Sequence, residues 1–248
     1  MAMTGMDIYK NLPKTNCKEC GFPTCLAFAM QVAAKQKALT DCPQLSDEAK
    51  DAFADASAPP MKLVHIGPEG DAQVKIGQET VMFRHEDKFY NASALAGKVA
   101  ASLSDEEASA RLRQINEAAF SRIGQDISVS MAAVEVEGLS ADAAAGRAKT
   151  LADASRVPLI LMGSDPAVVA AAAGAIADKK PLIYQATADN AEAMIKGAAD
   201  NKCPLAATAD TLEELADLAR SATDGGVTDV GLAFDGHNTA KTGRGMTS

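Results

Sequence analysis

Four of the chain's five cysteines fall within its first 42 residues, and their spacing constrains the fold more than any other feature. Cys17, Cys20, Cys25 and Cys42 form the pattern C-x2-C-x4-C-x16-C. Structural zinc sites are usually built from two short cysteine knuckles, and only the first pair has that form. Three close thiols and a distant one followed by proline are typical of cubane iron–sulfur sites. The spacing therefore favours a 4Fe–4S cluster bound by these four cysteines, with a zinc site as the alternative.

The composition is that of an acidic globular protein. The 248 residues include 24 Lys and Arg against 33 Asp and Glu, which gives a formal net charge of −9. Such a surface repels nucleic-acid phosphates and anionic lipid headgroups. No secretory pattern opens the chain, and the longest apolar run, Val168–Ala177, is about half the length of a membrane-spanning helix. We expect no nucleic-acid partner, no membrane and a cytoplasmic location, where reduced cysteines hold metal rather than form disulfides.

Local signals around the cysteines predict short helices. Apolar residues at helical spacing indicate an amphipathic turn or helix over residues 5–12. Thr24 is a suitable N-cap for a helix that runs from Cys25 to about residue 39. Cys25 would then lie at a helix N-terminus, where free N–H groups and the helix dipole favour a negatively charged, thiolate-ligated centre. We predict a cluster domain over residues 1–58.

A proline pair, Pro59-Pro60, marks the first predicted domain boundary, after a helix that begins near Ser46. Short β-prone runs separated by glycines follow this pair. They lie at Leu63–Ile66, Ala72–Ile76 and Thr80–Phe83. We interpret residues 59–92 as a linker with a small antiparallel β flap.

From residue 93 onwards, apolar runs alternate with alanine-rich helical segments. The six strand candidates are residues 95–101, 127–136, 158–162, 182–184, 204–207 and 229–234. Helix starts between them are indicated by capping boxes that begin at Ser104 and Thr211, and by the pair Asp165-Pro166. Even spacing of strands and single helices is typical of parallel strands joined by crossovers. The pattern predicts a parallel α/β domain over residues 93–248.

Two architectures can accommodate six such strands. A TIM barrel needs eight βα units and about 250 residues for the barrel alone, so only about six of its units would be present here. A doubly wound open sheet would accommodate six strands without remainder. However, no Gly-x-Gly-x-x-Gly turn of the nucleotide-binding kind follows any of them. Strand count alone favours the open sheet.

Several segments resemble those of the large subunits of corrinoid iron–sulfur proteins, which belong to the acetyl-CoA decarbonylase/synthase complex. The residues that carry the resemblance are Ile8–Met30, Asp41–Pro43, Ala58–Pro60, Phe83–His85, Phe89-Tyr90, Asp178–Tyr184 and Asn201–Ala206. The likeness spans essentially the whole chain. The cysteine module by itself recurs in other electron carriers, so the specificity comes from its combination with the α/β domain.

This resemblance implies a 4Fe–4S domain followed by a TIM barrel, with Cys17, Cys20, Cys25 and Cys42 as the cluster ligands. The chain departs from the family's pattern by stopping at Ser248, so that the last barrel units and the corrinoid-binding domain are absent: either it is part of a longer polypeptide or the remainder was never made. Corrinoid (cobalamin) would then be bound by the assembled complex rather than by these residues alone. In that family, a methyl group carried on cobalt passes from methyltetrahydrofolate to acetyl-CoA synthase. The cluster returns oxidised Co(II) to Co(I).

The resemblance implies three partners: the small subunit, the methyltetrahydrofolate methyltransferase and acetyl-CoA synthase. We therefore expect the electron-relay part of a corrinoid methyl carrier, with no catalytic side chain that can be nominated in the α/β domain. A ferredoxin-like electron carrier for another redox enzyme is the alternative, and a zinc-stapled interaction module is a third hypothesis. Cys203, which stands alone before an apolar strand, is interpreted as a buried core residue and not as a ligand.

Overall fold

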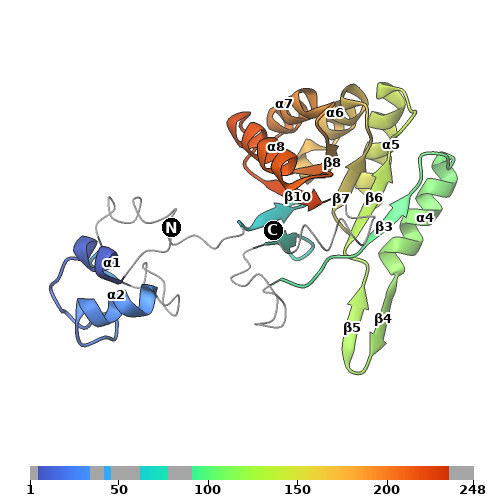
Figure 1. Cartoon of the computed structure of the whole chain (residues 1–248). Coiled ribbons are helices and arrows are strands. Elements are labelled where there is room, and N and C mark those ends of the chain that lie inside the picture. Colours follow the sequence, from blue (N-terminus) through green and yellow to red (C-terminus); the bar gives the residue numbers. More distant parts are fainter. Residues whose placement is uncertain (1–4, 34–41, 46–61, 78–90, 235–248) are drawn as a thin grey trace. The chain divides into compact units, whose positions relative to one another are not determined.

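A computed structural model of the chain describes residues 5–33, 42–45, 62–77 and 91–234 (Figure 1). The chain divides into two compact units. One comprises Met1–Lys62 with Gln78–Asp87, and the other comprises Leu63–Gly77 with Lys88–Ser248. Among the described residues, no helix is both long enough and apolar enough to cross a membrane. The helix predicted from Ser46, the proline pair and the β-prone run at residues 80–83 lie outside the described residues.

The small unit contains two short helices, α1 (Gly5–Asn11) and α2 (Cys25–Ala33). Helix α2 begins where the sequence predicts, because the Thr24 hydroxyl accepts a hydrogen bond from the Ala27 N–H at 3.1 Å. The buried apolar side chains described in this unit form one cluster, which consists of Ile8, Leu12, Cys25, Phe28, Ala29, Cys42 and Leu45. A core of this size rarely stabilises a domain without a metal, a disulfide or a partner.

The predicted flap is a two-stranded antiparallel hairpin in the second unit. Strand β1 (Val64–Ile66) pairs with β2 (Val74–Ile76), which confirms the first two β-prone runs. Val64 and Ile66 pack against Met131, Ala133 and Ile160 of the large sheet. The flap therefore covers part of one face of that sheet.

The large sheet has six strands, all parallel, and its strands lie side by side in chain order. They are β3 (Ala96–Val99), β6 (Met131–Glu135), β7 (Leu159–Met162), β8 (Leu182–Ala186), β9 (Leu205–Ala209) and β10 (Val230–Phe234). A doubly wound sheet has a point at which the strand order reverses, and the described strands have none. The doubly wound alternative is therefore wrong. The winding is the sequential one of a TIM barrel, in an open sheet whose described edges are β3 and β10.

Helices cover the other face of this sheet (Figure 1). They are α4 (Asp105–Glu117), α5 (Ala141–Ala154), α6 (Pro166–Ala175), α7 (Ala191–Asn201) and α8 (Leu212–Asp224), with a 3-10 turn at Ala177–Lys179. Side chains of β6 alternate between the two faces, because successive residues of a strand point in opposite directions. Ala132 and Val134 belong to the core beneath the helices, whereas Met131 and Ala133 belong to the core beneath the flap.

The predicted helix starts are formed by the caps that the sequence indicates. Ser104 and Glu107 form a reciprocal capping box: the Glu107 N–H donates to the Ser104 hydroxyl at 3.3 Å, and the Ser104 N–H donates to the Glu107 carboxylate at 2.9 Å. Asp165 caps α6, with Pro166 as the first helical residue. At α8, the Thr211 hydroxyl accepts the Glu214 N–H, but no return bond is formed among the described residues. The second box is therefore only half formed.

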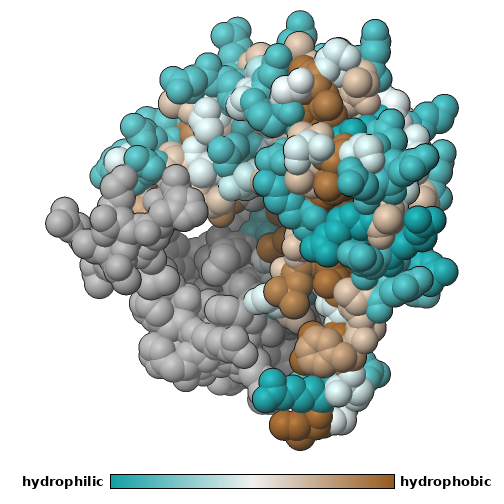
Figure 2. Space-filling model, turned by 90° about the vertical axis from the view of Figure 1, so that its right-hand side faces the viewer, coloured by the Kyte–Doolittle hydropathy of each residue, from teal (hydrophilic) through white to brown (hydrophobic). Residues whose placement is uncertain are grey.

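One strand prediction needs correction. The run 127–136 is not a single strand, because its first residues belong to a separate hairpin of β4 (Ala119–Arg122) and β5 (Gln125–Ser128). The turn of this hairpin is Ile123-Gly124, with φ of 51° and 71°. Two-residue turns of this kind are normally indicated by Asn-Gly or Asp-Gly in the sequence. Here isoleucine is the first turn residue, so the sequence does not predict the turn. Figure 2 shows hydrophobic residues at the lower end of the described surface, where the hairpin lies and where Ile123 is 93% exposed.

Candidate iron–sulfur site and a pocket at the sheet edge

The four predicted ligands occupy three backbone segments of the small unit. Cys17 and Cys20 lie in the loop between α1 and α2, Cys25 is the first residue of α2, and Cys42 opens the described segment 42–45. Cys25 and Cys42 are buried in the apolar cluster of this unit, Cys20 packs against that cluster, and Cys17 is exposed. The structure therefore places three of the four thiols in or against a single small core, and leaves the thiol of Cys17 exposed.

The environment of Cys42 shows that the thiols lie within electrostatic range of one another. Burial raises the pKa of the Cys42 thiol. A hydrogen bond from the Gln44 backbone lowers this pKa, while the negative charge of the thiolates of Cys20, Cys25 and Cys17 raises it. Positive charge from a bound metal centre would favour the ionised form of the Cys42 thiol.

Two side-chain hydrogen bonds tie the cysteine segments together. The side-chain oxygen of Asn16 accepts the backbone N–H of Cys25 at 2.8 Å. The side-chain amide of Gln44 donates to the carboxylate of Glu19 at 3.1 Å, which links the Cys42 segment to the Cys20 loop. These two side-chain hydrogen bonds therefore link the segments that carry the proposed ligands.

Four thiols are the donor type of both a cubane cluster and a structural zinc site. Within the described parts of the chain, no three Cys, His, Asp or Glu side chains converge in the manner of ligands to one metal ion. The preference for a cluster therefore rests on the spacing of the cysteines in the sequence.

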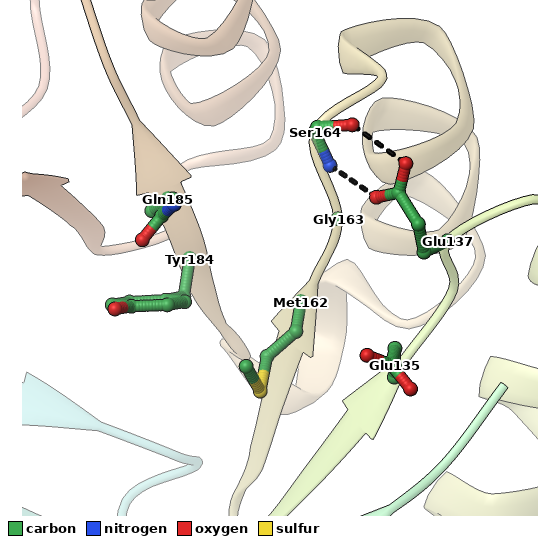
Figure 3. Close-up of a pocket in the computed structure, with 7 residues that line it drawn as sticks. All are labelled: Glu135, Glu137, Met162, Gly163, Ser164, Tyr184 and Gln185. Carbon is green, nitrogen blue, oxygen red and sulfur yellow. Dashed lines mark hydrogen bonds between the residues drawn. The ribbon is translucent and has the colours of Figure 1, made fainter.

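A second feature, which the sequence analysis missed, is a cavity of about 160 Å³ at the carboxyl ends of β6, β7 and β8 (Figure 3). Its lining residues are Glu135, Glu137, Met162, Gly163, Ser164, Tyr184 and Gln185. Carboxyl ends of parallel strands meet at one edge of a sheet, and ligand sites of α/β proteins occur there. The signal in the sequence is the pair Glu135 and Glu137, directly after the apolar strand β6.

Both carboxylates of this cavity are already engaged by the protein. Glu137 accepts the Ser164 hydroxyl and the Ser164 N–H, each at 2.7 Å, and these bonds lower the pKa of Glu137 (Figure 3). Glu135 accepts the Lys98 ammonium at 2.8 Å and the Ala101 N–H at 3.1 Å, which lowers its pKa. Both groups are ionised at neutral pH and fix neighbouring loops. They are therefore unsuited to donate protons in a reaction.

Cys203 is a buried core residue, as the sequence predicts. Its side chain is 3% exposed and belongs to the core beneath the helices. Burial raises the pKa of this thiol to about 11, so it stays protonated at neutral pH. Its Sγ donates to the carbonyl of Asn201 at 3.4 Å. A neutral, enclosed thiol is not available as a metal ligand.

Fold and site together define a class of protein: a cysteine-rich segment suited to an iron–sulfur cluster, joined to a parallel α/β domain with sequential strands. Comparison with protein families gives two matches. The family model CdhD, described as "CO dehydrogenase/acetyl-CoA synthase delta subunit", matches residues 63–248. A second model, whose description is of an Fe-S cluster, matches residues 12–44. The chain belongs to the CdhD family, since that model covers more than half of it.

Curated relatives agree with this assignment. The chain is 44% identical to the corrinoid/iron-sulfur protein large subunit of Moorella thermoacetica, over 88% of this chain and 49% of the relative. It is 34% identical to the acetyl-CoA decarbonylase/synthase complex subunit gamma of Methanopyrus kandleri, over 97% of this chain and 52% of the relative. The chain is also 34% identical to the same subunit of Methanothermobacter thermautotrophicus, over 94% of this chain and 50% of the relative. The chain spans about half the length of these relatives, and the predicted resemblance is confirmed.

Proposed function

We propose that this chain is the electron-relay part of a corrinoid methyl carrier in an acetyl-CoA decarbonylase/synthase system. Cys17, Cys20, Cys25 and Cys42 would hold a 4Fe–4S cluster. The observation that supports the proposal is that Cys20, Cys25 and Cys42 lie in or against one small core, within the segment that matches an Fe-S family model. The relatives' names, which combine iron–sulfur and corrinoid, support the methyl-carrier context.

Four cysteine ligands leave no open iron, so a bound cluster would supply one-electron transfer and not substrate binding. The proposed task is the reduction of inactive Co(II) to the Co(I) nucleophile. Corrinoid would be held by the assembled complex, with these residues contributing the cluster. The residues of the small unit bind and orient the metal centre: Cys25 from the N-terminus of α2, and Cys42 from the buried segment 42–45.

We propose that the α/β domain is a scaffold. The carboxylates of its cavity are committed to Ser164 and to Lys98, so they stabilise loops rather than take part in chemistry. The sheet would represent about six of the eight units of a TIM barrel, as its sequential winding supports. The proposed organisation is a cluster domain over residues 1–58, a linker and flap over 59–92, and a partial barrel over 93–248.

The proposed partners are the small subunit of the corrinoid iron–sulfur protein, the methyltetrahydrofolate methyltransferase and acetyl-CoA synthase, in the cytoplasm. Names of the relatives as subunits of one complex support this set. The family model that matches the α/β domain is described for the delta subunit, whereas the relatives are large or gamma subunits. Related α/β domains in two subunits of one complex are consistent with their association.

Metal analysis of the anaerobically purified chain is the decisive experiment. We expect about four irons and four sulfides per chain, with loss of both in the Cys20→Ala variant. Zinc without iron would overturn the proposal in favour of a zinc-stapled module. In the corrinoid-loaded complex, Cys20→Ala should leave initial methyl transfer intact and cause activity to decay as cobalt oxidises. A native complex that contains iron but no cobalt would favour the ferredoxin-like carrier.

A further inference from the structure

The loop that carries Cys17 and Cys20 has an unusual backbone. Lys14, Asn16 and Lys18 have φ of 56°, 49° and 65°, and they are three of the six non-glycine residues with positive φ in the described parts of the chain. The left-handed region is unfavourable for most side chains, and asparagine is among the few that tolerate it. Such conformations persist where the surrounding structure enforces them, and they cluster at functional sites.

Asn16 also makes a side-chain hydrogen bond that joins this loop to α2. Its oxygen accepts the N–H of Cys25 at 2.8 Å, across nine positions of sequence. Asn16 directly precedes Cys17, and Cys25 is itself a proposed ligand. A single hydrogen bond therefore sets the spacing between two ligands that the intervening loop would otherwise leave free to vary.

The same bond decides which backbone N–H groups of α2 are available to a ligated sulfur. Thr24 accepts the N–H of Ala27 through its hydroxyl, and that of Phe28 through its carbonyl. With Cys25 engaged by Asn16, the Leu26 N–H is the first-turn donor that lacks an acceptor among the described residues. Hydrogen bonds from N–H groups to cluster sulfurs help to set the reduction potential. Asn16 thus withholds one N–H from the proposed cluster.

We propose that Asn16 is a positioning residue of the iron–sulfur site, which fixes Cys17 relative to Cys25 and keeps the Cys25 N–H from donating to a cluster sulfur. This inference rests on the proposed function, because it requires a cluster on the four cysteines. It adds a residue that the cysteine pattern does not contain. Asn16 would act on the positions of the cysteine ligands and on the reduction potential of the cluster, and it would not bind iron itself.

Two substitutions separate the side-chain bond from the backbone conformation. Asn16→Gly keeps the left-handed backbone at no steric cost and removes the acceptor. Asn16→Asp keeps the acceptor in a residue that tolerates this conformation, and adds a negative charge. Asn11→Gly is the matched control, because the Asn11 side chain donates to the Asp7 carbonyl within α1.

The experiment compares these variants in the anaerobically purified chain, by EPR-monitored redox titration and by the rate of iron loss to a chelator. We expect Asn16→Gly to shift the EPR spectrum, to raise the midpoint potential and to lose iron about tenfold faster than the parent. Asn16→Asp should lose iron at close to the parent rate and shift the potential downward, because of its charge. Asn11→Gly should match the parent in all three measurements.

An Asn16→Gly protein with the parent's spectrum, potential and iron-loss rate would overturn the inference. So would a variant that loads less iron but whose loaded clusters have the parent's spectrum and potential, because a merely structural role predicts that result. If Asn16→Gly takes up no cluster at all, retention in Asn16→Asp supports the role of the acceptor, and loss in both contradicts it. If the parent chain itself binds no iron, the proposed function fails rather than this inference alone.

Discussion

The two units of this chain are stabilised in different ways. In the described residues, the cluster of the small unit has seven buried side chains, of which two are the thiols of Cys25 and Cys42. The core beneath the helices of the second unit has twenty-seven. Apolar burial stabilises a fold roughly in proportion to the area removed from water. We therefore expect the proposed cluster to contribute to the stability of the first unit, whereas the core of the second unit is sufficient for its fold.

Small residues make the second core dense. Ala172 and Ala173 of α6 and Ala144 and Ala148 of α5 are fully buried, with no exposed surface. Alanine allows helices to approach closely and costs no side-chain entropy when it is buried. The helical layer is therefore built from many short contacts, and it needs no ligand to hold it together.

The largest expected effect is that of removing the metal. Chelation of the proposed cluster, or the substitution Cys20→Ala, should unfold α1 and α2, because two of the seven buried side chains described in this unit are proposed ligands. Hydrogen exchange measured by mass spectrometry should show complete loss of protection in residues 5–33. Residues 91–234 should keep their protection, because their core contains no ligand. Protected α1 and α2 amides in the iron-free chain would contradict the comparison.

A core truncation in the second unit should have the opposite signature. Leu161 of β7 has no exposed surface, and Leu161→Ala should lower the free energy of unfolding of this unit by about 2–5 kcal/mol. Iron content and the EPR spectrum should stay unchanged. Chemical denaturation followed by circular dichroism, together with an iron assay, measures both quantities. A loss of iron in this variant would show that the two units are not independent.

A polar anchor of the second unit should contribute less than its core. The guanidinium of Arg147, with its side chain 11% exposed, bonds Asp105 and the carbonyls of Ala101 and Leu103. Arg147→Lys cannot reach all three acceptors, and we expect a loss of about 1–2 kcal/mol in chemical denaturation.

Arg220 supplies the control for this prediction. Its side chain is 75% exposed and pairs only with Asp217 in the described residues. Arg220→Lys should change the unfolding free energy by less than about 0.5 kcal/mol, as for other exposed ion pairs. If the two substitutions lower the unfolding free energy equally, the hydrogen bonds from Arg147 to the carbonyls of Ala101 and Leu103 do not contribute measurably to stability.

The smallest expected effect is on pH dependence. Hydrogen bonds from the Ser164 hydroxyl and N–H lower the pKa of Glu137. A carboxyl group with a lowered pKa in the folded state stabilises the fold above its unfolded pKa, and that contribution is lost as the pH falls through the folded pKa. Glu137→Gln should therefore flatten the decline in stability of the second unit below about pH 4.3. Denaturation curves of the parent and of Glu137→Gln at pH 7 and under acid conditions test this prediction. If the unfolding free energy of the two proteins declines equally with pH, the Glu137–Ser164 hydrogen bonds do not stabilise the fold in this way.

Much of the local structure was predictable from the sequence, because its signals act over a few residues. The caps at Thr24, Ser104 and Asp165 place helix starts where the structure has them. The β4–β5 hairpin was not predicted, because Ile123 in its turn adopts a positive φ, which β-branched residues rarely do. The cavity was missed for another reason. Glu137 and Ser164 are 27 residues apart, and only the parallel pairing of β6 with β7 brings them together.

By itself, the sequence predicted a cysteine-bound metal centre and determined the alternation of strands and helices, because ligand spacing and hydrophobic periodicity are properties of neighbouring residues. Only the tertiary structure decided between a doubly wound sheet and sequential winding, since strand order depends on which distant segments pair. It likewise revealed the bond from Asn16 to Cys25, because a loop must fold back on a helix before its side chain can reach a backbone group nine residues away.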